Sequence, residues 1–168
     1  VSEIEAGSIQ LHKDDVRFDT VLEQLEADYQ AMAQEKSIDL IFELPPKLPV
    51  LQGDRDKIVL AMHNLLGNAM KYTPNGGQVR IVVDSDEKQF TFQVNDSGIG
   101  INADELDCIF DKFYRASNSR EGSVTGSGLG LALAREVISL HGGDITVESE
   151  IKKGSTFTMT LPVLAEAA

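Results

Sequence analysis

Residues 64–74 read Asn-Leu-Leu-Gly-Asn-Ala-Met-Lys-Tyr-Thr-Pro, and no other stretch says as much about the architecture of the chain. It forms the second half of a helix that we predict over residues 54–72. Asn64, Asn68 and Lys71 are four and three residues apart, so their side chains share one stripe of that helix. Asparagine is a poor helix former, and two on one stripe indicate either solvent exposure or a shared ligand. Such a ligand would be Mg²⁺ bound by amide oxygens, with a phosphate neutralised by the lysine.

A second stripe of the same helix is apolar, which is typical of a helix that packs on a sheet. Its members are Ile58, Met62, Leu65, Leu66 and Ala69. Asp54 is the predicted N-cap. The periodicity predicts further helices at about 18–36 and 129–141, and strands at 39–44, 78–85, 89–95, 144–150 and 155–163. This order favours an α+β fold, a two-layer sandwich of a mixed, mainly antiparallel sheet with helices on one face.

The strand over residues 89–95 ends on a carboxylate. Phe90, Phe92 and Val94 alternate with polar residues, and the period of two places Asp96 on the apolar side. A buried carboxylate must find donors. It could cap the following turn, or it could accept the exocyclic amino group of a purine, with Gly98 and Gly100 letting the ring approach the backbone.

A glycine-rich run, Gly126-Ser127-Gly128-Leu129-Gly130, directly precedes the predicted helix at 129–141. Glycines at a helix start free backbone N–H groups to bind an anion, and the helix dipole favours negative charge there. The run lacks the Gly-Lys-Ser/Thr ending of the nucleoside-triphosphatase phosphate loop, and no strand leads directly into it. A phosphate-binding loop and a flexible hinge both remain possible from this pattern alone.

Composition narrows the class of partner. The formal net charge is −12, from 27 acidic and 15 basic residues, which argues against a nucleic-acid backbone as the main partner.

The longest apolar runs are a few residues, so we expect no membrane span and no direct membrane contact from this segment. The single Cys108 excludes an internal disulfide, as suits a cytoplasmic domain, although the parent protein could be membrane-anchored.

Taken in order, four motifs closely resemble those of sensor histidine kinases. Residues 64–74 resemble the N box, residues 96–100 the first glycine box, residues 110–115 the F box and residues 126–131 the second glycine box. The resemblance covers about 18–162. It implies the Bergerat-type ATP-binding fold shared by gyrase, heat-shock chaperone, histidine-kinase and mismatch-repair ATPases.

The resemblance also implies roles for individual residues. Asn68 resembles the Mg²⁺ ligand, with Asn64 beside it near the phosphates, and Lys71 resembles the phosphate-contacting lysine. Tyr72 resembles the ring that lies against the adenine, and Asp96 the carboxylate that reads it. Two further groups are carried over from the resemblance. The basic residues are Arg115 and Arg120, and the nucleotide-binding residues are Gly98, Gly100, Gly126, Gly128, Leu129, Gly130 and Ser155.

The implied activity is transfer of the γ-phosphate of Mg-ATP to a histidine on a dimerisation domain of the same kinase. A response regulator is implied as an indirect partner. No His-Asp/Glu-Leu-Arg-x-Pro motif occurs in the sequence, and His12, His63 and His141 lie in unsuitable contexts. Residues 1–12 are expected to be the end of a dimerisation helix or a linker, residues 13–168 the catalytic domain, and the acceptor histidine is expected to lie outside this chain.

Three alternatives stay open. An anti-sigma-factor serine kinase would phosphorylate a partner protein. An ATP hydrolase would carry a glutamate where Asn64 stands. A non-catalytic nucleotide-binding module would show damaged motifs, whereas these are intact.

Overall fold

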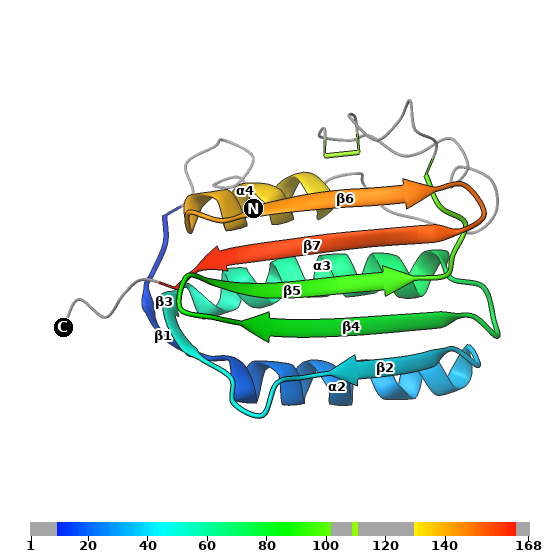
Figure 1. The fold of residues 1–168 in the computed structure, drawn as a ribbon, viewed down its shortest axis with the longest axis horizontal. Helices are drawn as coiled ribbons and strands as arrows, with labels where there is room; N and C mark the ends of the chain where they lie inside the picture. The colour runs from blue at the N-terminus through cyan, green and yellow to red at the C-terminus, as the bar shows by residue number, and fades with distance from the viewer. Residues whose placement is uncertain (1–9, 102–108, 111–129, 164–168) are drawn as a thin grey trace.

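The structure is a computed structural model that describes residues 10–101, 109–110 and 130–163. Within these residues a five-stranded sheet runs in the order β2-β4-β5-β7-β6 (Figure 1). Its strands are β2 (Asp39–Glu43), β4 (Gln78–Ser85), β5 (Gln89–Asp96), β6 (Asp144–Glu150) and β7 (Gly154–Pro162). The pair β2–β4 is parallel and the other pairs are antiparallel, which confirms the predicted mixed, mainly antiparallel sheet.

One face of this sheet is covered by helices, as predicted (Figure 1). They are α2 (Phe18–Glu35), α3 (Arg55–Tyr72) and α4 (Gly130–Leu140). The core lies between the two layers, where the rings of Phe18 and Phe90 are 4.2 Å apart. The predicted apolar stripe of α3, from Ile58 to Ala69, is buried there. Burial of such a stripe is the main force that holds a helix on a sheet.

A second, two-stranded sheet was not predicted. It pairs β1 (Asp14–Arg17) with β3 (Val50–Gly53) in antiparallel register at one end of the domain (Figure 1). Each strand has four residues, too short for a period of two to stand out. Residues 10–13, which lie in or next to the stretch predicted as a helix end or linker, carry no regular secondary structure, and residues 1–9 lie outside the described part.

No helix in the described part of the chain is both long enough and apolar enough to span a membrane.

Candidate functional site

The α3 stripe faces the start of α4. Asn64 and Asn68 are half-buried on α3, and Lys71 is exposed in its last turn. A Cβ added at Gly130 would lie 3.3 Å from Oδ1 of Asn64, so the first residue of α4 lies directly against the stripe. The helix stripe and the last glycine of the glycine-rich run, both candidate phosphate-binding elements, are therefore neighbours.

Asn64 has an amide nitrogen that the fold does not use. Its Nδ2 is buried without a hydrogen-bond partner in the described structure. Burying such a donor unpaired costs about 1–3 kcal/mol, so proteins rarely leave one unless a ligand or water completes the site. The burial of Nδ2 argues against the alternative that the Asn64 amide group is simply solvated at the surface.

Asp96 lies at the end of β5 and on the helix side of the sheet, as the alternation predicted. Its Oδ1 accepts a hydrogen bond of 2.9 Å from the N–H of Gly98, so Asp96 does cap the following turn, which was one of the two alternatives left open for it. Burial raises the pKa of the Asp96 carboxyl, although the N–H groups of Gly98 and Ser155 act in the opposite direction. A partly buried carboxyl whose pKa is shifted in this way is a candidate functional group.

The first glycine motif packs against the end of α3. A Cβ at Gly98 would lie 2.6 Å from the carbonyl oxygen of Tyr72 and 2.9 Å from Oδ1 of Asp96. Gly100 has φ of +75°, and a Cβ there would lie 2.1 Å from the carbonyl oxygen of Glu150. The close approach at both glycines is thus to the protein backbone. The Gly98 contact brings half-buried Tyr72 and Asp96 to one place.

Ser155 lies opposite Asp96 in the register between β5 and β7. It is buried on the same face as Phe157, Met159 and Leu161, as predicted. Its Oγ is 2.7 Å from Oγ of Ser149, whose hydroxyl donates to the carbonyl of Gly154. Ser155 therefore lies next to Asp96, on the neighbouring strand.

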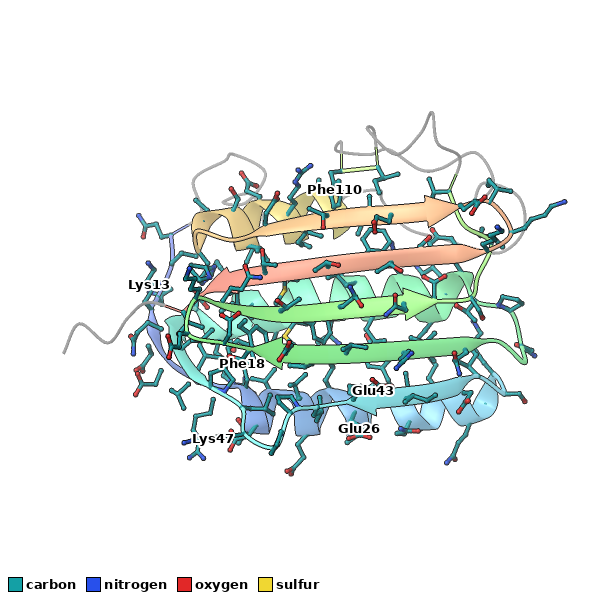
Figure 2. The ribbon with its side chains drawn as sticks, in the orientation of Figure 1. Lys13, Phe18, Glu26, Glu43, Lys47 and Phe110 are labelled. Atoms are coloured by element: carbon teal, nitrogen blue, oxygen red, sulfur yellow. The ribbon has the colours of Figure 1, made fainter. Side chains whose placement is uncertain are left out.

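The F motif is described only at its start. Phe110 lies beside α4 (Figure 2), with the Arg135 guanidinium 4.6 Å from its ring centroid and the Phe157 ring 6.4 Å away, edge-on. The contact fastens the segment to both α4 and β7. Arg115, Arg120, Gly126, Gly128 and Leu129, all predicted site residues, lie outside the described residues, as does Cys108.

The rings of His63 and His141 have structural partners. The Tyr29 hydroxyl is 3.0 Å from Nδ1 of His63. Nδ1 of His141 donates to the carbonyl of Val137 at 2.8 Å, and its Nε2 accepts from the N–H of Asp54 at 2.9 Å. Sequence reasoning missed this last bond because its partners are 87 residues apart.

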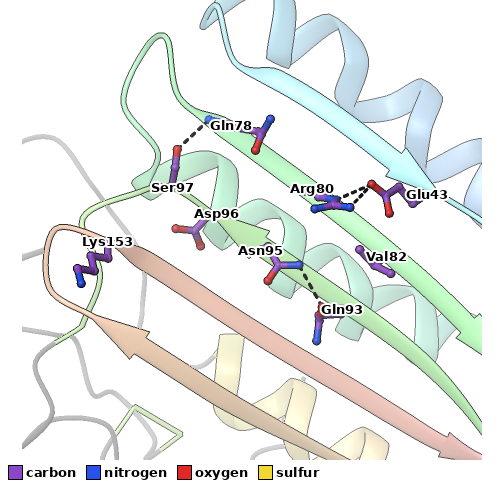
Figure 3. A pocket seen from close by; sticks show the side chains of 9 residues that line it. All are labelled: Glu43, Gln78, Arg80, Val82, Gln93, Asn95, Asp96, Ser97 and Lys153. Atoms are coloured by element: carbon purple, nitrogen blue, oxygen red, sulfur yellow. Dashed lines mark hydrogen bonds and ion pairs between the residues drawn. The ribbon is translucent and has the colours of Figure 1, made fainter.

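A hollow of about 530 Å³ lies on the opposite, open face of the sheet (Figure 3). Its lining includes Arg80, Glu43, Gln93 and Asn95. Nε of Arg80 donates to Glu43 at 2.6 Å and Asn95 donates to Gln93 at 3.1 Å, so these groups satisfy one another. Of the candidate site residues that the structure describes, Asp96 alone lines this hollow.

Comparison with known proteins agrees with this geometry. The family model described as histidine kinase-, DNA gyrase B-, and HSP90-like ATPase matches residues 53–165. The aerobic respiration control sensor protein ArcB of Escherichia coli is 42% identical over 173 residues, covering 99% of this chain and 22% of ArcB. Sensor histidine kinase WalK of Bacillus subtilis is 39% identical over 137 residues, covering 80% of this chain and 22% of WalK.

Among solved structures, full-length ShkA in complex with AMPPNP superposes with a TM-score of 0.79 at 28% identity. The match covers 95% of this chain and 33% of that one. This chain thus spans only 22% of the length of ArcB and of WalK. The family match, the order of the motifs and the fold all agree. The chain therefore belongs to the histidine kinase-, DNA gyrase B-, and HSP90-like ATPases, and it is an ATPase-family domain of the sensor histidine kinase type.

Proposed function

We propose that this chain binds Mg-ATP and transfers the γ-phosphate to a histidine on a dimerisation domain outside the chain, as a step of two-component signal transduction. The observation that carries the proposal is the meeting of three segments. Gly130 lies against Asn64, and the Gly98 turn lies against Tyr72 and Asp96. One side of this site offers amide groups and a helix N-terminus to phosphates. The other offers a carboxylate to the amino group of adenine.

Asn68 is the proposed Mg²⁺ ligand. No group of three or more His, Cys, Asp or Glu in the described residues could hold a metal ion. Mg²⁺ keeps several waters and shares substrate phosphates, so one amide oxygen from the protein suits it. Half-buried Asn68, one turn after the unpaired amide of Asn64, fits such a site. When bound, the ion would neutralise phosphate charge together with Lys71, Arg115 and Arg120.

The phosphoryl acceptor is an imidazole supplied by another domain. Asn64 has no carboxylate to deprotonate a water, so hydrolysis should be slow. A neutral imidazole is already a competent nucleophile. Both ring nitrogens of His141 have partners, and His63 is paired with Tyr29, so neither suits this role.

Further partners follow from this chemistry. A phosphohistidine on the dimerisation domain would pass its phosphoryl group to a response regulator, which this chain would serve only indirectly. We place the domain in the cytoplasm, where ATP is available and where a lone Cys108 stays reduced.

The first experiment is calorimetric titration of ATP into the parent and the Asp96→Asn variant. Gly98 N–H already holds Oδ1, so the amide of an asparagine would keep its oxygen there and turn its NH₂ toward the purine amino group. We expect affinity to fall by about tenfold or more. The matched control is Asn95→Ala, because Asn95 lies on the open face and bonds to Gln93. Equal affinity of parent and Asp96→Asn would refute the assignment of Asp96.

The second experiment mixes the chain with a separately supplied dimerisation domain that carries the acceptor histidine. We expect acid-labile, alkali-stable phosphate on that domain, formed slowly because the two parts are untethered. Asn68→Ala should weaken binding of Mg-ATP more than binding of metal-free ATP. Stable phosphoserine on a partner would instead support the anti-sigma serine kinase, and rapid phosphate release without an acceptor would support a hydrolase.

A further inference from the structure

The C-terminal turn of α3 is held by a lysine from another helix. Lys36 directly follows α2 and is half-buried. Its Nζ donates to the carbonyl oxygen of Met70, and to that of Thr73 at 3.2 Å. These are carbonyls at the end of α3, where the helix dipole is negative and an ammonium is favourable.

The two carbonyls bracket Lys71 and Tyr72, the residues proposed to contact phosphate and adenine. The same turn contacts the Gly98 motif, because a Cβ at Gly98 would lie 2.6 Å from the carbonyl oxygen of Tyr72. A shift of this turn would therefore move Tyr72 and disturb the surroundings of Asp96.

The main chain around Lys36 is itself fixed. Its N–H donates to the carbonyl of Met32 at 3.0 Å. Ser37 adopts φ of +55°, and its carbonyl accepts from the N–H of Gly76 at 2.9 Å. The N–H of Asp39 donates to the carbonyl of Gly77 at 2.9 Å. The junction after α2 is thus tied to the loop after α3 by two main-chain bonds, which preorganise the lysine toward its carbonyls.

We infer that Lys36 is a positioning residue of the nucleotide site, acting through the last turn of α3 on Tyr72 and Lys71. This inference rests on the proposed function, since it assigns Lys36 to the same site. Without the ammonium group, the last turn of α3 keeps its main-chain hydrogen bonds but loses the two hydrogen bonds from Lys36 on either side of Tyr72. In such a variant part of the free energy of ATP binding is spent on ordering this turn, which Lys36 orders in the parent, so the affinity for ATP is lower.

The test compares three variants of the chain by calorimetric titration of ATP, well below their unfolding temperatures. Lys36→Met should weaken ATP binding by about fivefold, and Lys36→Arg should retain the affinity of the parent. Lys57→Met is the matched control, because Nζ of Lys57 bonds to Asp54 at 3.3 Å at the other end of α3. It should change stability without changing affinity for ATP. Lys36→Gln repeats the test if Lys36→Met fails to fold.

The outcomes separate the inference from the proposed function. Equal affinity of parent and Lys36→Met overturns the role of Lys36 and leaves the proposed function intact. An equal loss in Lys57→Met also overturns it, since any loosening of α3 would then suffice. A parent chain that binds no ATP overturns the proposed function and this inference with it.

Discussion

The two ends of α3 differ in how completely their polar groups are paired. At the start, Oδ1 of Asp54 accepts from the N–H of Lys57 at 3.3 Å, and Oδ2 accepts from the N–H of His12 at 3.0 Å. The N–H of Asp54 donates to His141. Burial alone would raise the pKa of Asp54, but the N–H groups of His12 and Lys57 and the Lys57 ammonium hold that pKa below its ordinary value.

The second half of the helix is different. Nδ2 of Asn64 is buried and unpaired in the described structure, and so is Oγ1 of Thr73, a residue only 1% exposed that follows the helix. Both ends are built from buried polar groups, so burial does not distinguish them. The difference is that the first end satisfies its groups internally, whereas the second half leaves Nδ2 of Asn64 and Oγ1 of Thr73 without partners in the described structure, although Lys36 binds its last carbonyls. Unpaired groups therefore locate the site better than polarity does.

The largest effect on stability should come from the paired end. Asp54→Ala removes the N-cap and the acceptor of three hydrogen bonds, including one from a charged group. We expect the free energy of unfolding to fall by about 3 kcal/mol, measured by urea denaturation. Affinity for ATP, measured well below the unfolding transition, should stay that of the parent. A large loss of affinity would show that the two ends are not separate in function.

In the second half of the helix we expect a substitution to raise the free energy of unfolding rather than lower it. Asn64→Leu removes a buried unpaired amide, so the unliganded chain should gain about 1 kcal/mol of stability. Phosphotransfer to a supplied dimerisation domain should fall, because Asn64 lies against Gly130 at the proposed phosphate side. Lower stability in the variant would mean that an ordered water already satisfies Nδ2.

Thr73→Val tests the second unpaired group in the same way, with a smaller expected gain in stability. The replacement keeps the shape of the side chain and removes a buried hydroxyl without a partner in the described residues. We expect a gain of roughly 0.5–1 kcal/mol in the free energy of unfolding. Thr73→Ser is the control, since it keeps the hydroxyl and loses the methyl group, and it should be less stable than the parent.

The smallest effect concerns pH. Because the folded-state pKa of Asp96 is raised above its ordinary value of 3.8, the folded state binds the proton more tightly than the unfolded one. Its favourable contribution is present below pH 3.8 and is lost as the pH rises through the folded-state pKa. Asp96→Asn should thus be more stable than the parent at pH 7, and the gap should narrow as the pH approaches 4. A gap independent of pH would contradict the raised pKa.

Much of the fold could be predicted because its signals are local. The apolar stripe of α3 and the alternation in β5 gave the right elements and the right faces, since periods of 3.6 and two residues repeat within one element. The side of the sheet on which Asp96 lies followed from the same rule. The short strands β1 and β3 were missed, because four residues carry no clear period and their pairing joins Asp14 to Gly53.

Four features could be predicted from the chain alone: the helices, the main strands, the shared stripe of Asn64 and Asn68, and the inward direction of Asp96. The groups that meet across the fold could not: Gly130 with Asn64, Gly98 with Tyr72, Lys36 with the end of α3, and His141 with Asp54. The two sets differ in the range of the interactions along the chain. Backbone geometry repeats over a few residues and so can be read from neighbours in the chain, whereas Lys36 and Thr73 are 37 residues apart and His141 and Asp54 are 87 apart. Such contacts exist only after burial of the common core has brought the elements together.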